Sequence, residues 1–267
     1  MKDIQNSIDK RKLSINKTGI KHLIYPMKIA CKGDRYQTSV CEFDMFITLP
    51  HNFKGTHMSR FIEIVEKYRT KIINLDIIGE MAEDIMKKLE AKSAEIKIIF
   101  PFFIEKTSPI SKKKSLLNYQ CRFVCAIKGN TKENILEVRV PITTLCPCSK
   151  EISKNGAHNQ RSHVMIRVNS SRKIWIEDII KLVEKQAPCE IFTLLKRDDE
   201  KYVTEKAYKN PKFVEDIVRD IVFQIKKDKN IIWYGVGVLN EESIHNHDAF
   251  GYIEGGKTPK CIHWRYS

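Results

Sequence analysis

The order of predicted secondary structure occurs twice along this chain, and this repeat is the strongest constraint on its fold. In the first half, apolar residues at every second position predict strands, and apolar residues at i, i+3, i+4 and i+7 predict helices. The resulting order is a β-hairpin, two helices and two further strands. These elements are predicted at 22–50, 61–68, 78–89, 95–105 and 116–127.

The second half repeats this order of two strands, two helices and two strands. Its second helix is predicted to open at Asn210-Pro211, because asparagine is a favoured cap and proline a favoured first helical residue. The other helix is predicted from about Ile174. The strands are predicted at 135–140, 163–169, 231–239 and 249–254.

The repeat predicts an α+β chain of two tandem ββααββ modules, 21–132 and 133–267, after a charged N-terminal arm at 1–20. Antiparallel sheets with helices on one face leave edge strands whose backbone groups need partners. We therefore expect a homo-oligomer in which sheet edges pair into closed barrels. Active sites are then expected where subunits meet.

The composition narrows the class of protein. A net charge of +14 in 267 residues favours a polyanionic ligand. Lysines occur on nearly every predicted polar face and not in one patch, so a nucleoside triphosphate fits this charge as well as RNA does. The first residues lack the apolar centre of a signal peptide, and no run approaches the roughly 20 apolar residues of a membrane span. We expect a cytoplasmic protein with no membrane partner.

The segment from Pro141 to Arg161 is the clearest candidate for chemistry. Of eight cysteines, only Cys146 and Cys148 have neighbours that suggest a site, and His158 follows Cys146 by twelve positions. Thiolate and imidazole bind transition metals, and the same pair activates a sulfur nucleophile. Taken singly, each residue is better explained by packing or by an ordinary surface position. Together, and among many polar neighbours, they indicate a metal or nucleophile site.

A further ligand must come from elsewhere in the chain. The segment 196–205 supplies four carboxylates in a predicted loop, although such a string is usually a solvated charge run. Glu215 lies in the opening turn of a predicted helix, where acidic residues ordinarily complement the helix dipole. His245 and His247 form a His-x-His pair with both imidazoles on one side of an extended segment. This pair could bind metal, shuttle protons, bind phosphate or simply lie exposed in a turn.

Several ordered motifs resemble the type B GTP cyclohydrolase I family, and the resemblance covers nearly the whole chain. The motifs are KGTHMSRF, FFIEKTSPIS, TLCPCSKEIS, GAHNQRS, KRDDEKYVTEKAYKNPKFVEDIVRD and ESIHNHDAF. The resemblance implies the tunnelling fold, used twice per chain in a homotetramer. It also implies hydrolysis of GTP to 7,8-dihydroneopterin triphosphate and formate, the entry step to folate and, in many bacteria, to queuosine.

The resemblance also implies roles for individual residues. A divalent metal (Zn²⁺, Mn²⁺ or Fe²⁺) is expected on Cys146, His158 and Glu200, with Glu215 on the guanine edge. His245 resembles the family's active-site histidine, and Cys148 is a companion in the catalytic set alongside Cys146. The family's usual proline is Asp198 here, which leaves Glu200 in register and adds a negative charge. The triphosphate is expected to meet basic side chains, with Lys54, Arg60 and Arg161 as candidates.

Two other interpretations stay open at this stage. A basic RNA-binding module would hold a structural zinc in a closed four-ligand site, and would not turn over GTP. A tunnelling-fold reductase or synthase would use Cys146 or Cys148 as a nucleophile, and would respond to alkylation but not to chelators. The acidic strings near the candidate site favour the cyclohydrolase interpretation, with GTP as the ligand and no nucleic-acid partner.

Overall fold

The computed structural model of the chain describes residue 5 and residues 7–262. Its architecture is α+β, as the sequence predicts, and its strands follow the order β10-β9-β7-β6-β5-β4-β2-β1-β3, with β8 paired to β6. The elements in chain order are β1 (Ile15–Cys31), β2 (Arg35–Leu49), α1 (Ser59–Tyr68), β3 (Ile72–Ile73), α2 (Leu75–Leu89), β4 (Ser93–Thr107), β5 (Lys114–Lys128), β6 (Thr131–Leu145), α3 (Pro147–Ile152), β7 (Asn159–Ser170), α4 (Ile176–Gln186), β8 (Cys189–Glu190), α5 (Arg197–Lys209), α6 (Val214–Ile225), β9 (Ile231–Glu241) and β10 (Ala249–Gly256).

The chain forms two compact units that share three strands. Unit 1 comprises Met1–Pro101, Arg122–Leu136 and Pro259–Ser267, and unit 2 comprises Phe102–Cys121 and Glu137–Thr258. Strands β4, β5 and β6 each contribute one part to each unit. Each of these strands has 15 residues, or about 50 Å at about 3.3 Å per residue. The division into modules at 21–132 and 133–267 stays a prediction.

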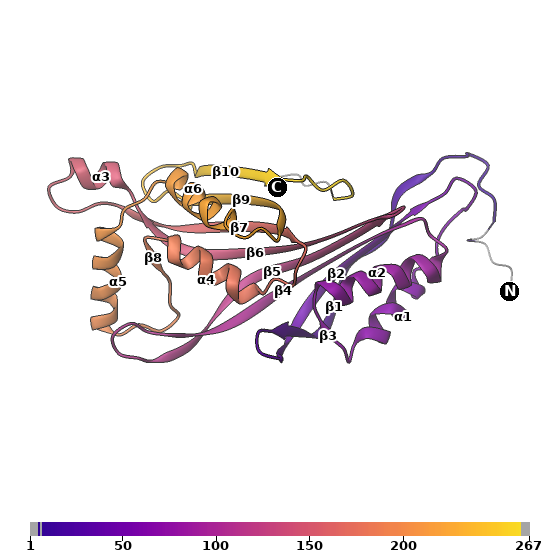
Figure 1. The fold of residues 1–267 in the computed structure, drawn as a ribbon, viewed down its shortest axis with the longest axis horizontal. Helices are drawn as coiled ribbons and strands as arrows, with labels where there is room; N and C mark the ends of the chain where they lie inside the picture. Colours follow the sequence, from indigo (N-terminus) through magenta and orange to yellow (C-terminus); the bar gives the residue numbers. More distant parts are fainter. Residues whose placement is uncertain (1–4, 6, 263–267) are drawn as a thin grey trace. The chain divides into compact units, whose positions relative to one another are not determined.

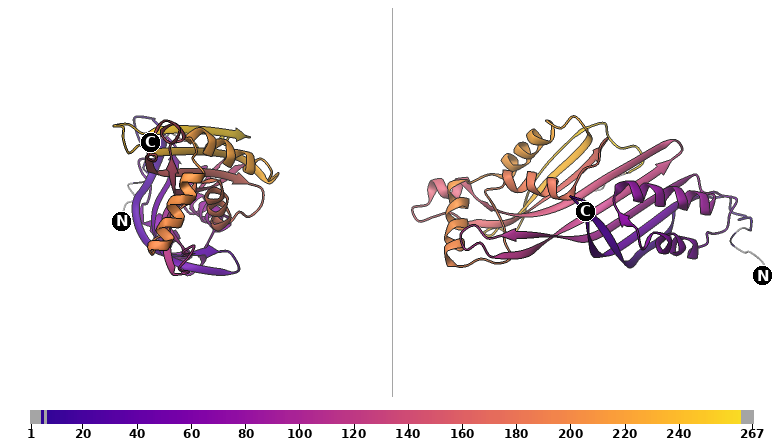
Figure 2. Two further views of the ribbon diagram at one scale, coloured as in Figure 1. Left: turned by 90° about the vertical axis from the view of Figure 1, so that its left-hand side faces the viewer. Right: turned by 60° about the horizontal axis from the view of Figure 1, so that its bottom comes forward.

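Unit 1 packs helices α1 and α2 side by side on its strands (Figure 1; Figure 2, right). The predicted hairpin is confirmed, because β1 pairs antiparallel with β2, and β2 pairs in turn with β4. Helix α2 begins at Asn74, whose side chain accepts a hydrogen bond from the Ile77 backbone at 2.9 Å. The core contains side chains with no solvent exposure, including Phe43, Met45, Phe61, Ile78 and Met81.

Strand β1 begins at Ile15, so it extends into the segment assigned from sequence to an N-terminal arm at 1–20. Part of that arm, residues 1–4 and 6, lies outside the described residues. The strand continues through Gly19 because this residue has no side chain: a Cβ there would lie 1.9 Å from the Met45 carbonyl oxygen. A bulge follows between Ile20 and Leu23, where His22 adopts a φ of 57°.

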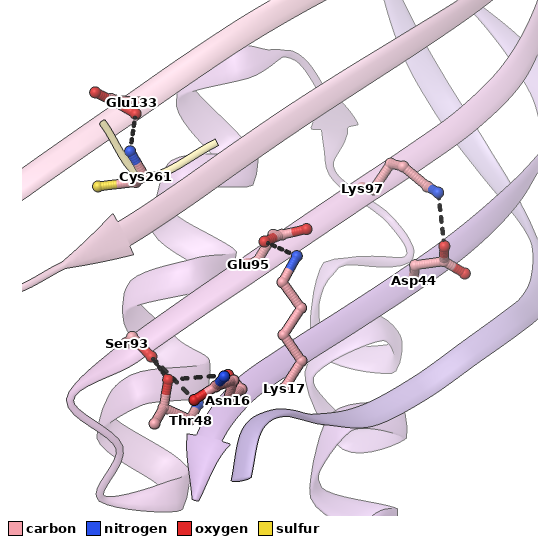
Figure 3. A network of polar contacts seen from close by, with 9 residues as sticks. All are labelled: Asn16, Lys17, Asp44, Thr48, Ser93, Glu95, Lys97, Glu133 and Cys261. Atoms are coloured by element: carbon pink, nitrogen blue, oxygen red, sulfur yellow. Dashed lines mark hydrogen bonds and ion pairs between the residues drawn. The ribbon is translucent and has the colours of Figure 1, made fainter. Parts of the chain in front are cut away.

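The last described residues of the chain return to unit 1. The backbone N–H groups of Lys260 and Cys261 donate to the two carboxylate oxygens of Glu133, at 2.6 and 2.7 Å. Figure 3 shows the bond from Cys261. Glu133 is buried, and these two bonds satisfy both of its oxygens. The carboxylate therefore holds this segment against β6.

Unit 2 contains an antiparallel set of strands covered by helices. Strand β9 pairs with β7 on one side and with β10 on the other, and β6 pairs with β8. Helix α6 packs on β9 and β10 and also contacts α4 (Figure 1). The apolar faces of α4 and α6 are buried against the strands, and the core residues include Ile179, Ile217, Ile221, Val236 and Val238. Unit 2 carries the residues that the sequence predicts for metal binding and catalysis.

Two local predictions in unit 2 were wrong. The segment 196–205 is not a loop: all of it except Lys196 lies in helix α5, and three of its four acidic residues occupy the first turn, where they complement the helix dipole. Helix α6 begins at Val214 and not at Asn210-Pro211. Asn210 instead ends α5, and the Phe213 backbone N–H donates to the Asp216 carboxylate at 3.1 Å to start α6.

Candidate active site

Cys146 and His158 lie together at the connection between β6 and β7. The backbone N–H of Cys146 donates to the carbonyl oxygen of His158 at 3.2 Å. Cys146 caps the short helix α3, where its Sγ accepts from the Ser149 backbone N–H at 3.4 Å, and Pro147 begins the helix. The Ser149 hydroxyl in turn accepts from the His158 backbone N–H at 3.1 Å. The connection thus folds back on itself.

The ring of His158 is held by polar neighbours. Its Nδ1 lies 3.1 Å from the Gln160 side-chain oxygen and 3.4 Å from the Ser243 hydroxyl. Gln160 is buried and also donates to Glu242 at 3.3 Å. Partners on Nδ1 orient the imidazole, as they do for metal-ligating histidines. They leave Nε2 as the ring nitrogen that is available to bind a metal ion. The same contacts bring the β9–β10 connection, which carries His245, next to His158.

Helices α3 and α5 lie next to each other (Figure 1). The Lys150 ammonium group donates to the Tyr208 carbonyl oxygen at 2.7 Å and lies 4.5 Å from the centroid of its ring. Lys150 belongs to the helix that follows Cys146, and Tyr208 to the helix that carries Glu200. The helix that follows Cys146 and the helix that carries Glu200 are therefore in direct contact.

The first turn of α5 contains one acidic residue that is fully buried. The Asp199 carboxylate accepts from the backbone N–H groups of Ile110, Ser111 and Lys196 and from the Ser111 hydroxyl, at 2.5–2.9 Å. Burial acts to raise the pKa of Asp199. The hydrogen bonds, the Ser111 hydroxyl foremost, outweigh that effect and lower the pKa of Asp199 below its ordinary value.

The other sequence-predicted site residues lie on the surface of unit 2. Glu200 is exposed in the first turn of α5, and Glu215 is exposed in the first turn of α6. His245 is exposed in the β9–β10 connection, where its ring stacks on His247 at 5.1 Å between centroids. Cys148 is exposed on α3. Within one chain the predicted metal ligands Cys146, His158 and Glu200 do not gather: in the described part of the chain, the group of three ligand atoms within 4.8 Å of one another lies elsewhere.

That group is His22, Glu42 and Asp44 on strands β1 and β2 of unit 1. The His22 Nδ1 lies 2.7 Å from a Glu42 oxygen, and the His22 backbone donates to Asp44 at 3.1 Å. The other Asp44 oxygen is paired with the Lys97 ammonium at 2.7 Å (Figure 3). The negative charge of Asp44 is thus already balanced by a protein cation.

The candidate triphosphate-binding residues lie in both units. In unit 1, the Arg60 guanidinium donates to the Lys88 carbonyl oxygen at 3.0 Å, so it helps to hold α1 against α2. Lys54 is exposed, and its backbone N–H donates to Ser7 at 3.0 Å. In unit 2, Arg161 is exposed on β7 opposite Glu241 of β9.

Comparison with known proteins assigns the family. The sequence profile of the family described as type I GTP cyclohydrolase folE2 matches residues 1–251. This chain belongs to that family. Two curated FolE2 relatives are GTP cyclohydrolase FolE2 of Magnetococcus marinus, 46% identical over 257 residues, and that of Nitrosomonas eutropha, 50% identical over 256 residues. The alignments cover 96% of this chain and 97% and 96% of the two FolE2 relatives.

Solved structures similar to this FolE2-family chain include two uricases. The uricase of Arthrobacter globiformis matches with a TM-score of 0.52 at 8% identity, covering 93% of this chain and 96% of the uricase. The urate oxidase of Bacillus subtilis matches with a TM-score of 0.53 at 9% identity, covering 90% and 98%. At such low identity the likeness concerns the fold alone, and it supports the predicted tunnelling fold.

The donor set of this FolE2-family chain fits a divalent metal at Cys146 and His158. Sulfur and imidazole donors lie on one connection, and the imidazole is oriented through Nδ1 in the way that metal sites require. Within the described residues, no three-ligand group contains a cysteine. A closed structural zinc site of the RNA-binding interpretation therefore finds no support in the single chain.

In the described part of the chain, no helix is both long and apolar enough to cross a bilayer.

Sequence reasoning missed several residues of this site. Gln160 could have been identified, because it follows His158 by only two positions in the sequence. The roles of Ser243, Lys150 and Asp199 could not, because each acts on a residue far away in the sequence. Asp199, for example, binds residues 88 and 89 positions earlier in the chain.

Proposed function

We propose that this chain is a metal-dependent GTP cyclohydrolase I that converts GTP and water to 7,8-dihydroneopterin triphosphate and formate. The observation that carries the proposal is the family match over residues 1–251, which includes every candidate site residue. The juxtaposition of Cys146 and His158 supports it independently, because these residues were selected from the sequence for their chemistry. The product is expected to enter folate or queuosine synthesis.

Cys146, His158 and Glu200 are the residues that would hold one divalent metal. A thiolate, an imidazole and a carboxylate form a set of intermediate softness, which suits Zn²⁺, Mn²⁺ or Fe²⁺. A bound divalent cation supplies Lewis acidity and lowers the pKa of water towards neutrality, so that water can add to guanine C8. Gln160 and Ser243 keep the His158 ring in its orientation.

Glu215 and His245 would act on the base of GTP. A carboxylate at Glu215 can accept from both the N1–H and the exocyclic amine of guanine, which a guanine edge presents side by side. His245 would give a proton to a ring nitrogen of the guanine as its five-membered ring opens, because histidine is the side chain that most often serves as a general acid. Cys148 is exposed on α3 and would be a companion in the catalytic set.

The active enzyme is expected to be a cytoplasmic homotetramer in which neighbouring subunits complete each site. Two observations support this assembly. Glu200, Glu215 and His245 are exposed in the single chain, and the three expected metal ligands do not converge within it. Closing the sheet edges against other subunits would also satisfy the backbone groups of the edge strands. The net charge of +14 favours attraction of the triphosphate.

Formate release from GTP tests the proposed reaction. Metal-stripped protein should be inactive, and adding Mn²⁺, Zn²⁺ or Fe²⁺ separately should restore turnover and rank the metals. The Glu200→Gln variant should lose both metal and activity. A cysteine-nucleophile reductase or synthase would instead be stopped by iodoacetamide and remain indifferent to chelators. Folded, metal-loaded protein that releases no formate with any of these metals would overturn the proposal.

A further inference from the structure

The connection between β4 and β5 contains none of the expected metal ligands or GTP-binding residues. We propose that this loop, residues 108–113, positions the metal ligand Glu200 by binding the buried carboxylate of Asp199. The inference rests on the proposed function, because it assigns Ser111 and Asp199 as positioning residues for a ligand of that metal site. Neither residue touches metal or substrate in this proposal.

The Asp199 carboxylate is buried and is surrounded by hydrogen-bond donors. It has no solvent exposure, and it accepts hydrogen bonds from two backbone N–H groups and one hydroxyl of the loop. The β4–β5 connection lies beside the start of α5 (Figure 1). A fourth bond comes from the backbone of Lys196, at the start of α5. Its neighbours Asp198 and Glu200 are exposed. One acidic residue of the turn is therefore committed to the protein interior and the next one is presented outward.

Hydrogen bonds within the β4–β5 loop hold it in the shape that this contact requires. Ser108 is buried, and its hydroxyl accepts from the Lys113 backbone at 2.8 Å while lying 2.9 Å from the Ser111 hydroxyl. The Ser108 backbone N–H closes the loop by donating to the Lys113 carbonyl oxygen at 2.9 Å. Lys112 adopts a φ of 56°, a conformation that turns the chain sharply. These bonds aim the N–H groups of Ile110 and Ser111 at one point.

Helix α5 depends on such polar anchors because it has almost no apolar face. Its buried residues are Asp199 and Ala207, whereas α6 buries six apolar side chains. Other polar contacts of α5 include the Lys206–Glu190 ion pair at 2.8 Å, the Lys150–Tyr208 contact, and the bond from the side chain of Asn210, at the end of α5, to the Ala187 carbonyl oxygen at 3.4 Å. Packing alone does not fix the rotation of α5 about its axis. Asp199 fixes it, and with it the direction in which Glu200 presents its carboxylate.

Metal affinity tests this assignment apart from turnover. We compare the wild type with Asp199→Asn and Ser111→Ala by chelator competition for Zn²⁺ and by the absorption spectrum of the Co²⁺-loaded protein. Both variants should lose metal affinity by about 10–100-fold, as metal sites do when an outer partner of a ligand is removed. The Co²⁺ bands should shift, and kcat should fall with little change in KM for GTP. Ser111→Thr keeps the hydroxyl and should restore the affinity lost in Ser111→Ala.

Asn74→Ala is the matched control. It removes a helix-capping acceptor of the same kind from α2 in unit 1, so it should lower the melting temperature and leave metal affinity and the Co²⁺ spectrum unchanged. If Asp199→Asn does not fold, Ser111→Ala decides the question. Folded variants with wild-type metal affinity and spectrum would overturn the inference, while a wild type without metal binding or formate release would instead overturn the proposed function.

Discussion

The backbone N–H of Cys146 donates to the carbonyl oxygen of His158 at 3.2 Å, although the two residues are twelve positions apart in the sequence. Between them, α3 turns the chain, and the Ser149 hydroxyl accepts from the His158 backbone. These bonds hold Cys146 and His158 next to each other.

This relationship predicts different outcomes for the two neighbouring cysteines. Cys146→Ser should reduce metal affinity by more than about 100-fold, since losing an outer partner alone costs about 10–100-fold. Cys148→Ser should keep its metal, because Cys148 is an exposed residue of α3 and is not one of the three expected ligands. Metal content after dialysis, measured by atomic absorption, checks both variants. Equal metal loss in the two variants would contradict the assignment of Cys146.

Glu215→Gln should impair recognition of GTP without affecting the metal. The neutral amide cannot accept from both guanine N–H groups, and a hydrogen bond to a charged group contributes about 1.5–3 kcal/mol. We expect kcat/KM to fall about 10–100-fold, at about 1.4 kcal/mol for each factor of ten. Asp76→Asn is the control, because Asp76 is likewise an exposed acidic residue in the first turn of a helix. Steady-state kinetics that show this fall in kcat/KM for Glu215→Gln alone, with unchanged metal content, would support the role of Glu215 in binding guanine. An equal fall for both substitutions would refute it.

Gly19→Ala should destabilise unit 1. The added Cβ would lie 1.9 Å from the Met45 carbonyl oxygen, so strands β1 and β2 must separate locally. Overpacking of this kind costs about 1–3 kcal/mol in the free energy of unfolding. At Gly55 the nearest atom to an added Cβ is a side-chain carbon of Gln5 at 3.4 Å, so Gly55→Ala should be nearly neutral. Urea unfolding of both variants measures the difference, and equal stability would show that the strand does not need glycine here.

His163 should make the free energy of unfolding depend on pH below about 6.5. Burial, and then the positive charge of Arg139, lowers the pKa of His163 below its usual 6.5, although Glu241 at 3.3 Å partly opposes this. As pH falls through 6.5, the unfolded chain therefore binds a proton before the folded chain does, and the folded state loses stability. Above that pH the contribution is fully present.

The His163→Gln variant isolates this effect because glutamine does not titrate. Urea unfolding at pH 7.5 and at pH 5.5 should show a smaller loss of stability in the variant than in the wild type. The same loss in both proteins would assign the pH dependence to other groups.

Local sequence patterns anticipated much of this fold. The hairpin of β1 and β2, the helices α1, α2 and α4, and the strands β9 and β10 each carry a regular apolar period, and each occurs close to its predicted place. Helix α5 was not predicted, because it lacks such a period. Its mostly polar sequence has no apolar stripe, and the bonds from Ile110 and Ser111 that start it come from a distant loop.

The sequence by itself determined the class of fold, the family and the cysteine–histidine connection, because these depend on residue types and short spacings. Only the tertiary structure decided which acidic residue of α5 is buried and which is exposed. Asp198, Asp199 and Glu200 are nearly equivalent as a string of charges. They differ because a carboxylate leaves water only where enough donors replace its hydration, and the β4–β5 loop provides those donors at Asp199 alone within this turn.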